Sequence, residues 1–347
     1  MISKMKTPED GGSRVAIVFN GSPLFTGAAG SGESEIRRWI IENDWLEAVV
    51  ALPDQLFYNT GISTYFWIVT NRKRPERRGK VQLIDARASF TKMRKSLGEK
   101  RKEVSTDQIA DLVRLYASFE PGDRCKIFDN EDFGFARITV ERPLRLRWEV
   151  TDGGVEALKV DKNFAKLADI EQASILTDVS PTDGGHHLGS SADDTAVRQL
   201  AKAAMKRAGV SGKPIENAIV DAFALTDPAA PIVTDGKGSP TPDPDLRDAE
   251  NVPLSVEAVG RARYEPDVTQ RLASRPYREH VTQYLEAEVI PYVPDAWIDH
   301  PKTKIGYEIP LTRHFYTYTP PRPLAEIDAE IKALEAEIQA LLSEVTE

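Results

Sequence analysis

The chain has 347 residues, of which 41% are hydrophobic and 29% charged, and its formal net charge is −9. This composition is typical of a globular protein with room for two or three domains. A single cysteine, Cys125, excludes a disulfide framework and a cysteine-based metal cluster, which fits a reducing compartment. No apolar run approaches the roughly 18–20 residues of a membrane span, and the N-terminus is unlike a signal peptide, so we expect a cytoplasmic protein without membrane contact.

The charge is unevenly distributed along the chain. Residues 1–150 contain 25 basic and 21 acidic residues, whereas the remainder contains 20 and 33. Within the first part, Arg72–Lys102 contains 13 basic and three acidic residues, beginning with Arg72, Lys73 and Arg74. Such a patch can contact nucleic-acid phosphates. The alternative is a solvated surface segment.

Three short apolar runs near the N-terminus predict strands buried on both faces, at Val15–Phe19, Leu46–Leu52 and Tyr65–Val69. A helix is expected at Ser34–Asn43, between the first two. The connection between the second and third strands has only about ten residues, which is short for a crossover, so we expect the third to run antiparallel. These elements indicate an α/β sheet. Three strands and one helix make a poor sheet, so the piece is expected to belong to a larger one.

The helix is expected to bury one apolar face. Its periodicity places Ile36, Trp39 and Ile40 inward, with Arg37 and Arg38 pointing elsewhere.

Two loops in this region have ligand-binding features. Gly27–Gly32 lies between a strand and a helix, but it lacks the Lys-Ser/Thr of a phosphate loop and the spacing of a dinucleotide fingerprint, which favours a linker. Asp54–Ser63 follows the carboxyl end of a strand, where open α/β sheets bind ligands, and it contains Phe57 and Tyr58. An aromatic ring there could stack on a nucleic-acid base. The alternative is that one or both rings simply cover the sheet.

The remainder predicts a mainly helical chain. Apolar periodicity predicts strands at Val81–Ala86 and Leu144–Val150, and helices at 88–120, Thr195–Ala208, Ile215–Ala224 and Tyr277–Val289. The proline-rich segment 228–253 is expected to be an extended linker. His186-His187 is a weak metal candidate, for which a surface loop is the favoured interpretation. The predicted domains are 1–90 (α/β), 91–260 (mainly helical, with the linker) and 261–347 (a C-terminal helical tail).

The last segment, 323–345, predicts a long helix with an a/d heptad stripe. Its apolar residues alternate at spacings of three and four: Leu324, Ile327, Ile331, Leu334, Ile338, Leu341 and Val345. Such a stripe either docks on its own domain or pairs with another subunit.

Several segments together resemble one protein family. They are GGSRVAIVFNGSPLF, GESEIRRWIIENDWLEAVVALPDQLFYNTGISTYFWIVTNRK, FARITVERPLR and KTKIGYEIPLTRHFYTYTPPRPLAEIDAEIKALEAEI. They resemble the modification (M) subunit of type I restriction–modification systems, an adenine-N6 DNA methyltransferase that uses S-adenosylmethionine. The resemblance implies a partial Rossmann-like methyltransferase sheet, consisting of its last three strands plus an extra strand, followed by a mainly α-helical C-terminal region.

The chain departs from this family in its catalytic motif. The family has an Asp/Asn-Pro-Pro-aromatic tetrapeptide, but the one Pro-Pro here, Pro320-Pro321, lies between Thr319 and Arg322. Gly27–Gly32 is also misplaced for the family's methyl-donor loop. The chain therefore resembles the C-terminal part of such a subunit. We assign no catalytic residue and no metal ligand, place the main S-adenosylmethionine-binding loop outside this chain, and expect no activity from the chain alone.

The resemblance also implies binding residues and partners. Phe57 falls where related enzymes place the aromatic that stacks on the flipped adenine, and Asn59, Thr60 and Gly61 would shape the same loop. The family's C-terminal helices contact the DNA-specificity (S) subunit, in an assembly that includes the restriction (R) subunit. Two alternative functions stay open. One is a non-catalytic assembly module that binds the S subunit through the heptad helix, and the other is a sequence-independent DNA-binding domain based on the basic patch.

Overall fold

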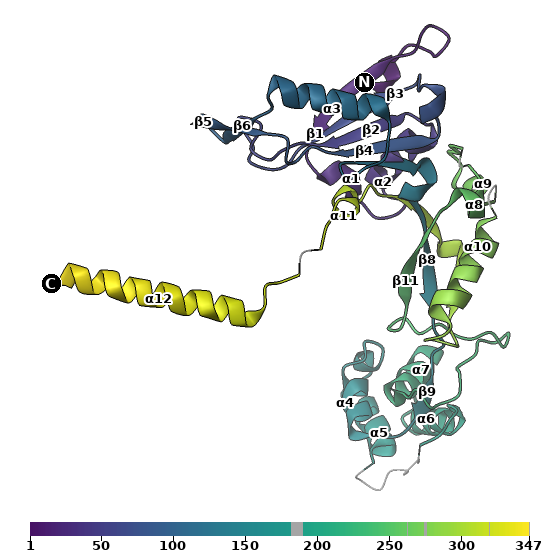
Figure 1. The fold of residues 1–347 in the computed structure, drawn as a ribbon. Coiled ribbons are helices and arrows are strands. Elements are labelled where there is room, and N and C mark those ends of the chain that lie inside the picture. The colour runs from purple at the N-terminus through teal and green to yellow at the C-terminus, as the bar shows by residue number, and fades with distance from the viewer. Residues whose placement is uncertain (182–189, 262, 274–275, 319, 347) are drawn as a thin grey trace. The chain divides into compact units, whose positions relative to one another are not determined.

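The computed structural model describes residues 1–181, 190–261, 263–273, 276–318 and 320–346 (Figure 1). His186-His187 lies outside these residues. The chain divides into two compact units, one of Met1–Phe133 with Tyr307–Glu347 and one of Gly134–Gly306. These bounds differ from the predicted 1–90, 91–260 and 261–347, because residues 307–311 pack with the N-terminal residues.

The first unit is built on a five-stranded sheet of order β1-β3-β2-β4-β7. Its strands are β1 (Arg14–Phe19), β2 (Leu46–Ala51), β3 (Tyr65–Thr70), β4 (Lys80–Asp85) and β7 (Cys125–Asp129). β3 lies between β1 and β2 and runs antiparallel to both, whereas β2 and β4 are parallel. The three predicted strands and the antiparallel direction of the third are therefore confirmed.

The strands differ in burial, which corrects one expectation. β2 is buried along its whole length, as its unbroken apolar run predicts. β1 is an edge strand, with Val18 and Phe19 exposed by 42% and 36%. The expectation that β1 is buried on both faces is wrong, since its six residues are exposed or only partly buried.

Helices lie on opposite faces of this sheet (Figure 1). α2 (Gly32–Glu42), preceded by the short α1 (Ser22–Phe25), covers one face, and α3 (Thr106–Ser118) covers the other. A capping box between Ser105 and Gln108 fixes the start of α3. Its residues Leu112, Leu115 and Tyr116 pack against Val50, Ile84 and Ala86 of the sheet and its edge.

The buried face of α2 agrees with the prediction only in part. Ile40 is buried as expected. Ile36 is 59% exposed, whereas Arg37 and Arg38 are only 2% and 1% exposed. The Arg38 guanidinium pairs with Glu42 at 2.7 Å, and Arg37 Nε donates to the carbonyl oxygen of Tyr307 at 2.6 Å. Tyr307 also donates its hydroxyl to Glu42 at 2.9 Å. Local periodicity missed this face because Tyr307 comes from a segment 270 residues away from Arg37.

The segment 88–120 is not the predicted single helix. Residues 91–103 form a two-stranded hairpin of β5 (Thr91–Leu97) and β6 (Lys100–Glu103), and α3 begins only afterwards. The two strands are joined at Gly98 and Glu99, and Gly98 has a φ of +61°. Glycine accommodates this backbone without strain, so the chain can turn back on itself here. We call residues 91–103 the basic hairpin.

The second unit combines a small sheet with a helical cluster. In the sheet, β8 (Gly134–Glu141) pairs with β11 (Asp248–Pro253), β12 (Trp297–Ile298) and β13 (Lys304–Tyr307). The predicted linker, 228–253, is wrong at its end, because residues 248–253 form β11 and pair with β8. α8 (Val256–Val259), α9 (Val268–Ala273), α10 (Tyr277–Tyr284) and the π-helical turn Leu285–Val289 follow it along the chain.

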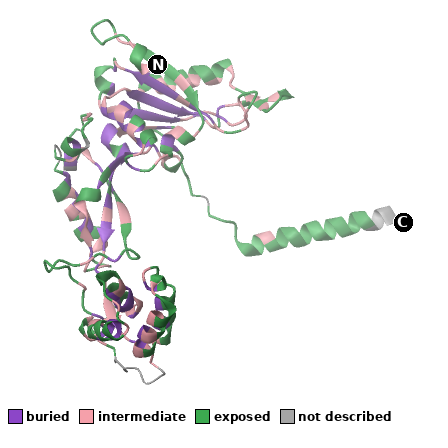
Figure 2. Cartoon of the chain, turned by 180° about the vertical axis from the view of Figure 1, so that it is seen from behind, coloured by how far each residue is buried: buried purple, intermediate pink, exposed green. Residues whose placement is uncertain are grey.

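The helical cluster contains its own core (Figure 2). It consists of α4 (Asp152–Lys159), α5 (Asp169–Val179), α6 (Thr195–Arg207) and α7 (Lys213–Ala222), with the short paired strands β9 (Leu146–Trp148) and β10 (Ala224–Thr226). The inward face predicted for α6 is confirmed, because Val197, Leu200, Ala204 and Met205 are all buried.

The chain ends in the short α11 (Leu311–His314) and the long α12 (Leu324–Thr346). Apolar side chains of α12 are exposed by half or more of their surface: Leu324, Leu334, Ile338, Leu341 and Leu342, with Ile331 at 49%. Among the described residues, no helix has the length and apolar character needed to cross a membrane.

Candidate nucleic-acid interface

The connection between β2 and β3 places two aromatic side chains at the surface. Residues 54–63, which we call the aromatic loop, follow the carboxyl end of β2. Phe57 and Thr60 pair across a tight turn, with Tyr58 and Asn59 at its centre. Phe57 is 37% exposed and Tyr58 60%. Neither ring is therefore fully buried against the sheet, and both are partly exposed to solvent.

The basic hairpin is docked directly on the aromatic loop. The backbone N–H of Glu99 donates to the carbonyl oxygen of Tyr58 at 3.1 Å, and that of Arg101 donates to the carbonyl oxygen of Gln55 at 2.9 Å. Gln55 has a φ of +56°, a left-handed conformation that few non-glycine residues adopt. β6 thus bonds to β5 on one edge and to the aromatic loop on the other.

Side chains reinforce this contact. Lys102 forms an ion pair with Asp54 of the aromatic loop, and its ammonium lies 3.9 Å from the centre of the Phe90 ring. The Lys100 ammonium lies 5.5 Å from the centre of the Tyr58 ring, within the range of a cation–π interaction. Aromatic and cationic groups therefore share one continuous surface.

The remaining predicted loop residues lie beside Phe57, as expected from their position in the chain. Asn59 is exposed, and Thr60 accepts a long hydrogen bond of 3.4 Å from the backbone N–H of Ile62. A Cβ added at Gly61 would lie 3.2 Å from a carboxylate oxygen of Glu99. Gly61 therefore leaves room for the turn of the basic hairpin.

The other predicted DNA-binding residues do not join this surface. β3 begins at the aromatic loop and runs antiparallel to β2, so Arg72, Lys73 and Arg74, which follow its far end, lie at the opposite edge of the sheet. Lys73 is 6% exposed, and its ammonium lies 2.6 Å from a carboxylate oxygen of Asp44. Burial lowers the pKa of Lys73. Lys73 is an internal ion-pair residue, and its ammonium is not presented at this surface.

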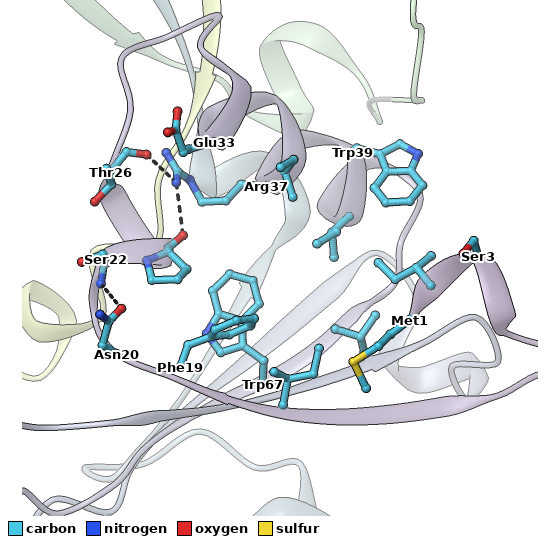
Figure 3. A pocket seen from close by; sticks show the side chains of 16 residues that line it. Met1, Ser3, Phe19, Asn20, Ser22, Thr26, Glu33, Arg37, Trp39 and Trp67 are labelled. Atoms are coloured by element: carbon cyan, nitrogen blue, oxygen red, sulfur yellow. Dashed lines mark hydrogen bonds between the residues drawn. The ribbon is translucent and has the colours of Figure 1, made fainter. Parts of the chain in front are cut away.

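A second surface feature is an apolar groove of about 720 Å³ between α2 and the strands β1 and β3 (Figure 3). Ile17, Phe19, Ile36, Trp39 and Trp67 contribute its walls. The free edge of β1 borders it. The groove is therefore an uncovered part of the sheet's own apolar face.

One polar group at the groove stands out. Arg37 donates to the carbonyl oxygens of Pro23 and Thr26 at 3.1 and 2.8 Å (Figure 3). Its Nη2 is buried and has no hydrogen-bond partner among the residues that the structure describes. Burial lowers the pKa of this guanidinium. A buried donor without an acceptor is unfavourable.

The glycine-rich loop beside the groove is packed against its own side chains. A cradle for a methyl donor presents backbone N–H groups to its ligand, with glycines allowing close approach. A Cβ added at Gly27 would lie 2.4 Å from Ser31 Oγ and 2.9 Å from Glu33, so the glycine-rich loop is closed on its own side chains. Among the residues that the structure describes, no cluster of three or more His, Cys, Asp or Glu side chains could hold a metal ion.

The basic hairpin is the part of this surface that the sequence prediction missed. Its signal was present in the glycine of the Leu97-Gly-Glu-Lys100 turn, flanked by two short runs with exposed charges. The sequence analysis identified Tyr58 as an aromatic residue of the loop. Its contact with the basic hairpin depends on backbone geometry, which the spacing of residues in the sequence does not reveal.

Comparison with known proteins finds a match in the N-terminal part of the chain. Residues 2–141 match the family model described as N-6 DNA Methylase. That range includes the whole sheet, the aromatic loop and the basic hairpin. This part of the chain is therefore similar to the N-6 DNA methylases.

Individual proteins that the chain resembles are type I restriction enzyme methylase subunits. The chain is 30% identical over 136 residues to the MjaIX methylase subunit of Methanocaldococcus jannaschii, covering 39% of this chain and 23% of that one. It is 41% identical over 87 residues to the HindI methylase subunit of Haemophilus influenzae, covering 25% of this chain and 17% of that one. The chain thus spans less than a quarter of the length of these relatives.

Among solved structures, the chain is similar to the type I restriction–modification methyltransferase subunit of Streptococcus thermophilus. The sequence identity is 26% and the TM-score 0.30, over 35% of this chain and 24% of that one.

Proposed function

We propose that the chain is part of a type I restriction–modification DNA methyltransferase, which transfers a methyl group from S-adenosylmethionine to adenine N6 in DNA. Its role there is to present the aromatic loop to a base that has left the duplex. The observation that carries this proposal is the exposed Phe57 ring, at the carboxyl edge of the sheet of an N-6 DNA methylase segment. Enzymes that modify a base extrude it from the stack and hold it between aromatic or apolar side chains.

The other predicted residues of the aromatic loop support the position of Phe57 in this proposal. Asn59, Thr60 and Gly61 set the path of the turn that exposes Phe57. The stacked base stays in contact with the loop, so its exocyclic amine is held outside the duplex for the time that the transfer requires. S-adenosylmethionine supplies the methyl group when bound, and its main binding loop lies outside the 347 residues.

The first test measures binding of an unpaired adenine by the full chain. Fluorescence anisotropy compares a fully paired duplex with one that has an adenine opposite an abasic site. The chain prefers the second duplex, and Phe57→Ala weakens that preference by about 5- to 150-fold, because base–aromatic stacking is worth about 1–3 kcal/mol.

A matched variant, Ile62→Ala, removes another exposed apolar side chain of the same loop and should leave the preference unchanged. Equal binding of both duplexes by the unmodified chain would remove the base-holding role.

The second test concerns catalysis. The 347 residues contain no Asp/Asn-Pro-Pro-aromatic sequence. We therefore expect the purified chain, mixed with DNA and radiolabelled S-adenosylmethionine, to transfer no methyl group above background. Turnover by the chain alone would contradict this part of the proposal.

The partners proposed from the family are the DNA-specificity and restriction subunits. The observation in favour of the first is the largely exposed apolar stripe of α12, formed by Leu324, Ile327, Ile331, Leu334, Ile338 and Leu341. A non-catalytic assembly module, binding the specificity subunit through this stripe, is the second candidate function.

A further inference from the structure

The basic hairpin contains cations that the structure leaves without acidic partners. Residues 91–103 include six basic and two acidic residues. Within the described parts of the chain, Lys92, Arg94, Lys95 and Arg101 have no ion pair, and all four side chains are exposed. Lys102 is the one hairpin cation paired with a carboxylate there. The hairpin thus presents unneutralised positive charge.

The arrangement of these charges destabilises the hairpin itself. Lys92 and Lys102 lie directly opposite each other across β5 and β6. Like charges in that position destabilise a strand pair. Asp54 relieves the repulsion at Lys102 alone. This arrangement becomes favourable when an anion lies over the hairpin.

Basic residues in the preceding segment are used differently. Lys73 pairs with Asp44, Lys80 with Asp129 at 2.9 Å, and Arg87 with Asp85 at 2.7 Å. Arg77 is buried, and its guanidinium lies 4.5 Å from the centre of the Tyr116 ring. Within the described residues, Arg74 and Arg78 are also exposed without an ion pair, but they follow the far end of β3. The hairpin is therefore the group of unpaired cations that lies beside the aromatic loop.

The position of the hairpin identifies the ligand. Its turn is bonded to the carbonyl oxygen of Tyr58, next to Phe57. β5 has seven residues, which at about 3.3 Å each extend over about 23 Å. One DNA strand has a phosphate about every 3.4 Å along the helix axis, so a strand of this length can follow several phosphates.

We propose that the basic hairpin binds the sugar–phosphate backbone of the DNA strand whose unpaired base reaches Phe57. This inference rests on the proposed function for the identity of the base, and it adds the element that holds the flanking phosphates. Backbone and base are then bound by one structural element, since β6 and the aromatic loop are joined by main-chain hydrogen bonds.

The test measures how salt weakens DNA binding by the full chain. Fluorescence anisotropy between 50 and 200 mM salt, with a fully paired duplex, gives the slope of log affinity against log salt. The triple variant Arg94→Ala, Lys95→Ala, Arg101→Ala should have a shallower slope, by about one for each phosphate that the hairpin no longer neutralises. These side chains are exposed, so the fold should be retained, which circular dichroism checks.

Two further variants make the result specific. Removal of three exposed lysines from the other unit, by Lys162→Ala, Lys166→Ala and Lys206→Ala, should leave the slope unchanged. Exchange of the hairpin arginines in Arg94→Lys and Arg101→Lys keeps the charge and should also keep the slope.

The outcomes separate this inference from the proposed function. An unchanged slope in the hairpin triple variant, or an equal decrease in the lysine control, overturns the hairpin inference. A shallower slope confined to the hairpin variant supports it, whatever the duplex with an unpaired adenine shows. Loss of the preference for unpaired adenine tests Phe57 and the proposed function instead.

Discussion

The backbone N–H of Glu99 donates a 3.1 Å hydrogen bond to the carbonyl oxygen of Tyr58, and so fixes the basic hairpin to the aromatic loop. The two residues are 41 positions apart and come from different connections of the sheet. Their contact brings exposed rings and unpaired cations onto one surface. Stacking groups beside cations are the usual means by which proteins bind single-stranded nucleic acid.

Gly98 is the residue on which this contact depends most. Its φ is +61°, and a Cβ there would lie 2.9 Å from the carbonyl oxygen of Tyr58. We predict that Gly98→Val undocks the hairpin, because a β-branched residue is strained in this conformation and collides with the loop. Limited trypsin digestion should then cut faster at Lys95 and Arg101.

The control for this variant is Gly236→Val. Gly236 has open space around its Cβ position and no positive φ. Its substitution should leave the cleavage rate at the hairpin unchanged. Equal cleavage of Gly98→Val and the unmodified chain would mean that the hairpin is held by other contacts.

Asp85 gives a prediction for the pH dependence of stability. A side-chain hydrogen bond from Arg87 lowers the pKa of the Asp85 carboxyl below its ordinary value of 3.8. The folded state therefore binds this proton less readily than the unfolded state does. The stabilisation is complete above the ordinary pKa and is lost as the pH falls through the lowered one.

We therefore predict that Arg87→Ala decreases the free energy of unfolding near neutral pH, by at most about 1 kcal/mol because the pair is partly exposed. The difference from the unmodified chain should shrink as the pH falls below the ordinary pKa of Asp85. Urea denaturation at several pH values measures it. A difference that stays constant down to the most acidic pH would show that Arg87 acts through packing alone.

The heptad stripe of α12 should bind the specificity subunit. Ile331→Asp together with Ile338→Asp should weaken capture of that subunit by about a hundredfold or more, since burying each side chain is worth about 1.5–3 kcal/mol. Quantitative pull-down with the purified subunit measures this. Ala329→Asp with Ala336→Asp adds the same charges off the stripe and should preserve capture. Equal capture by both double variants would exclude the stripe from the interface.

The free edge of β1 should make the chain prone to self-association. Its unpaired backbone groups and the exposed Val18 can pair with another strand. We predict that Val18→Lys reduces the concentration-dependent rise in mass seen by analytical ultracentrifugation. Val113→Lys, at an exposed site on α3, is the matched control. A similar effect of both substitutions would point to general solubility and not to the strand edge.

The sequence predicted the parts of the fold that are governed by local pattern. The unbroken apolar run of β2, the short connection to β3 and the inward face of α6 each have one dominant local cause, and the structure agrees with all three. The buried arginines of α2 were missed because Arg37 bonds to a carbonyl oxygen far away in the sequence and Arg38 pairs with a neighbouring carboxylate.

The candidate interface was also predicted only in part, because some of its contacts join residues that are distant in the sequence. Phe57 stood out as an aromatic residue in a polar loop, and it is exposed. Lys73 was predicted to lie at the surface, but it is buried and forms an ion pair with Asp44. The charge of the hairpin was visible in the sequence, but its strand pairing and its contact with Tyr58 depend on one glycine turn.

Hydrogen exchange of the full chain, with and without DNA containing an unpaired adenine, tests the central claim most directly. The account predicts that DNA slows exchange in both the aromatic loop, 54–63, and the basic hairpin, 91–103, while α12 is unaffected. Protection confined to segments outside residues 54–103, with unchanged exchange in loop and hairpin, would contradict it.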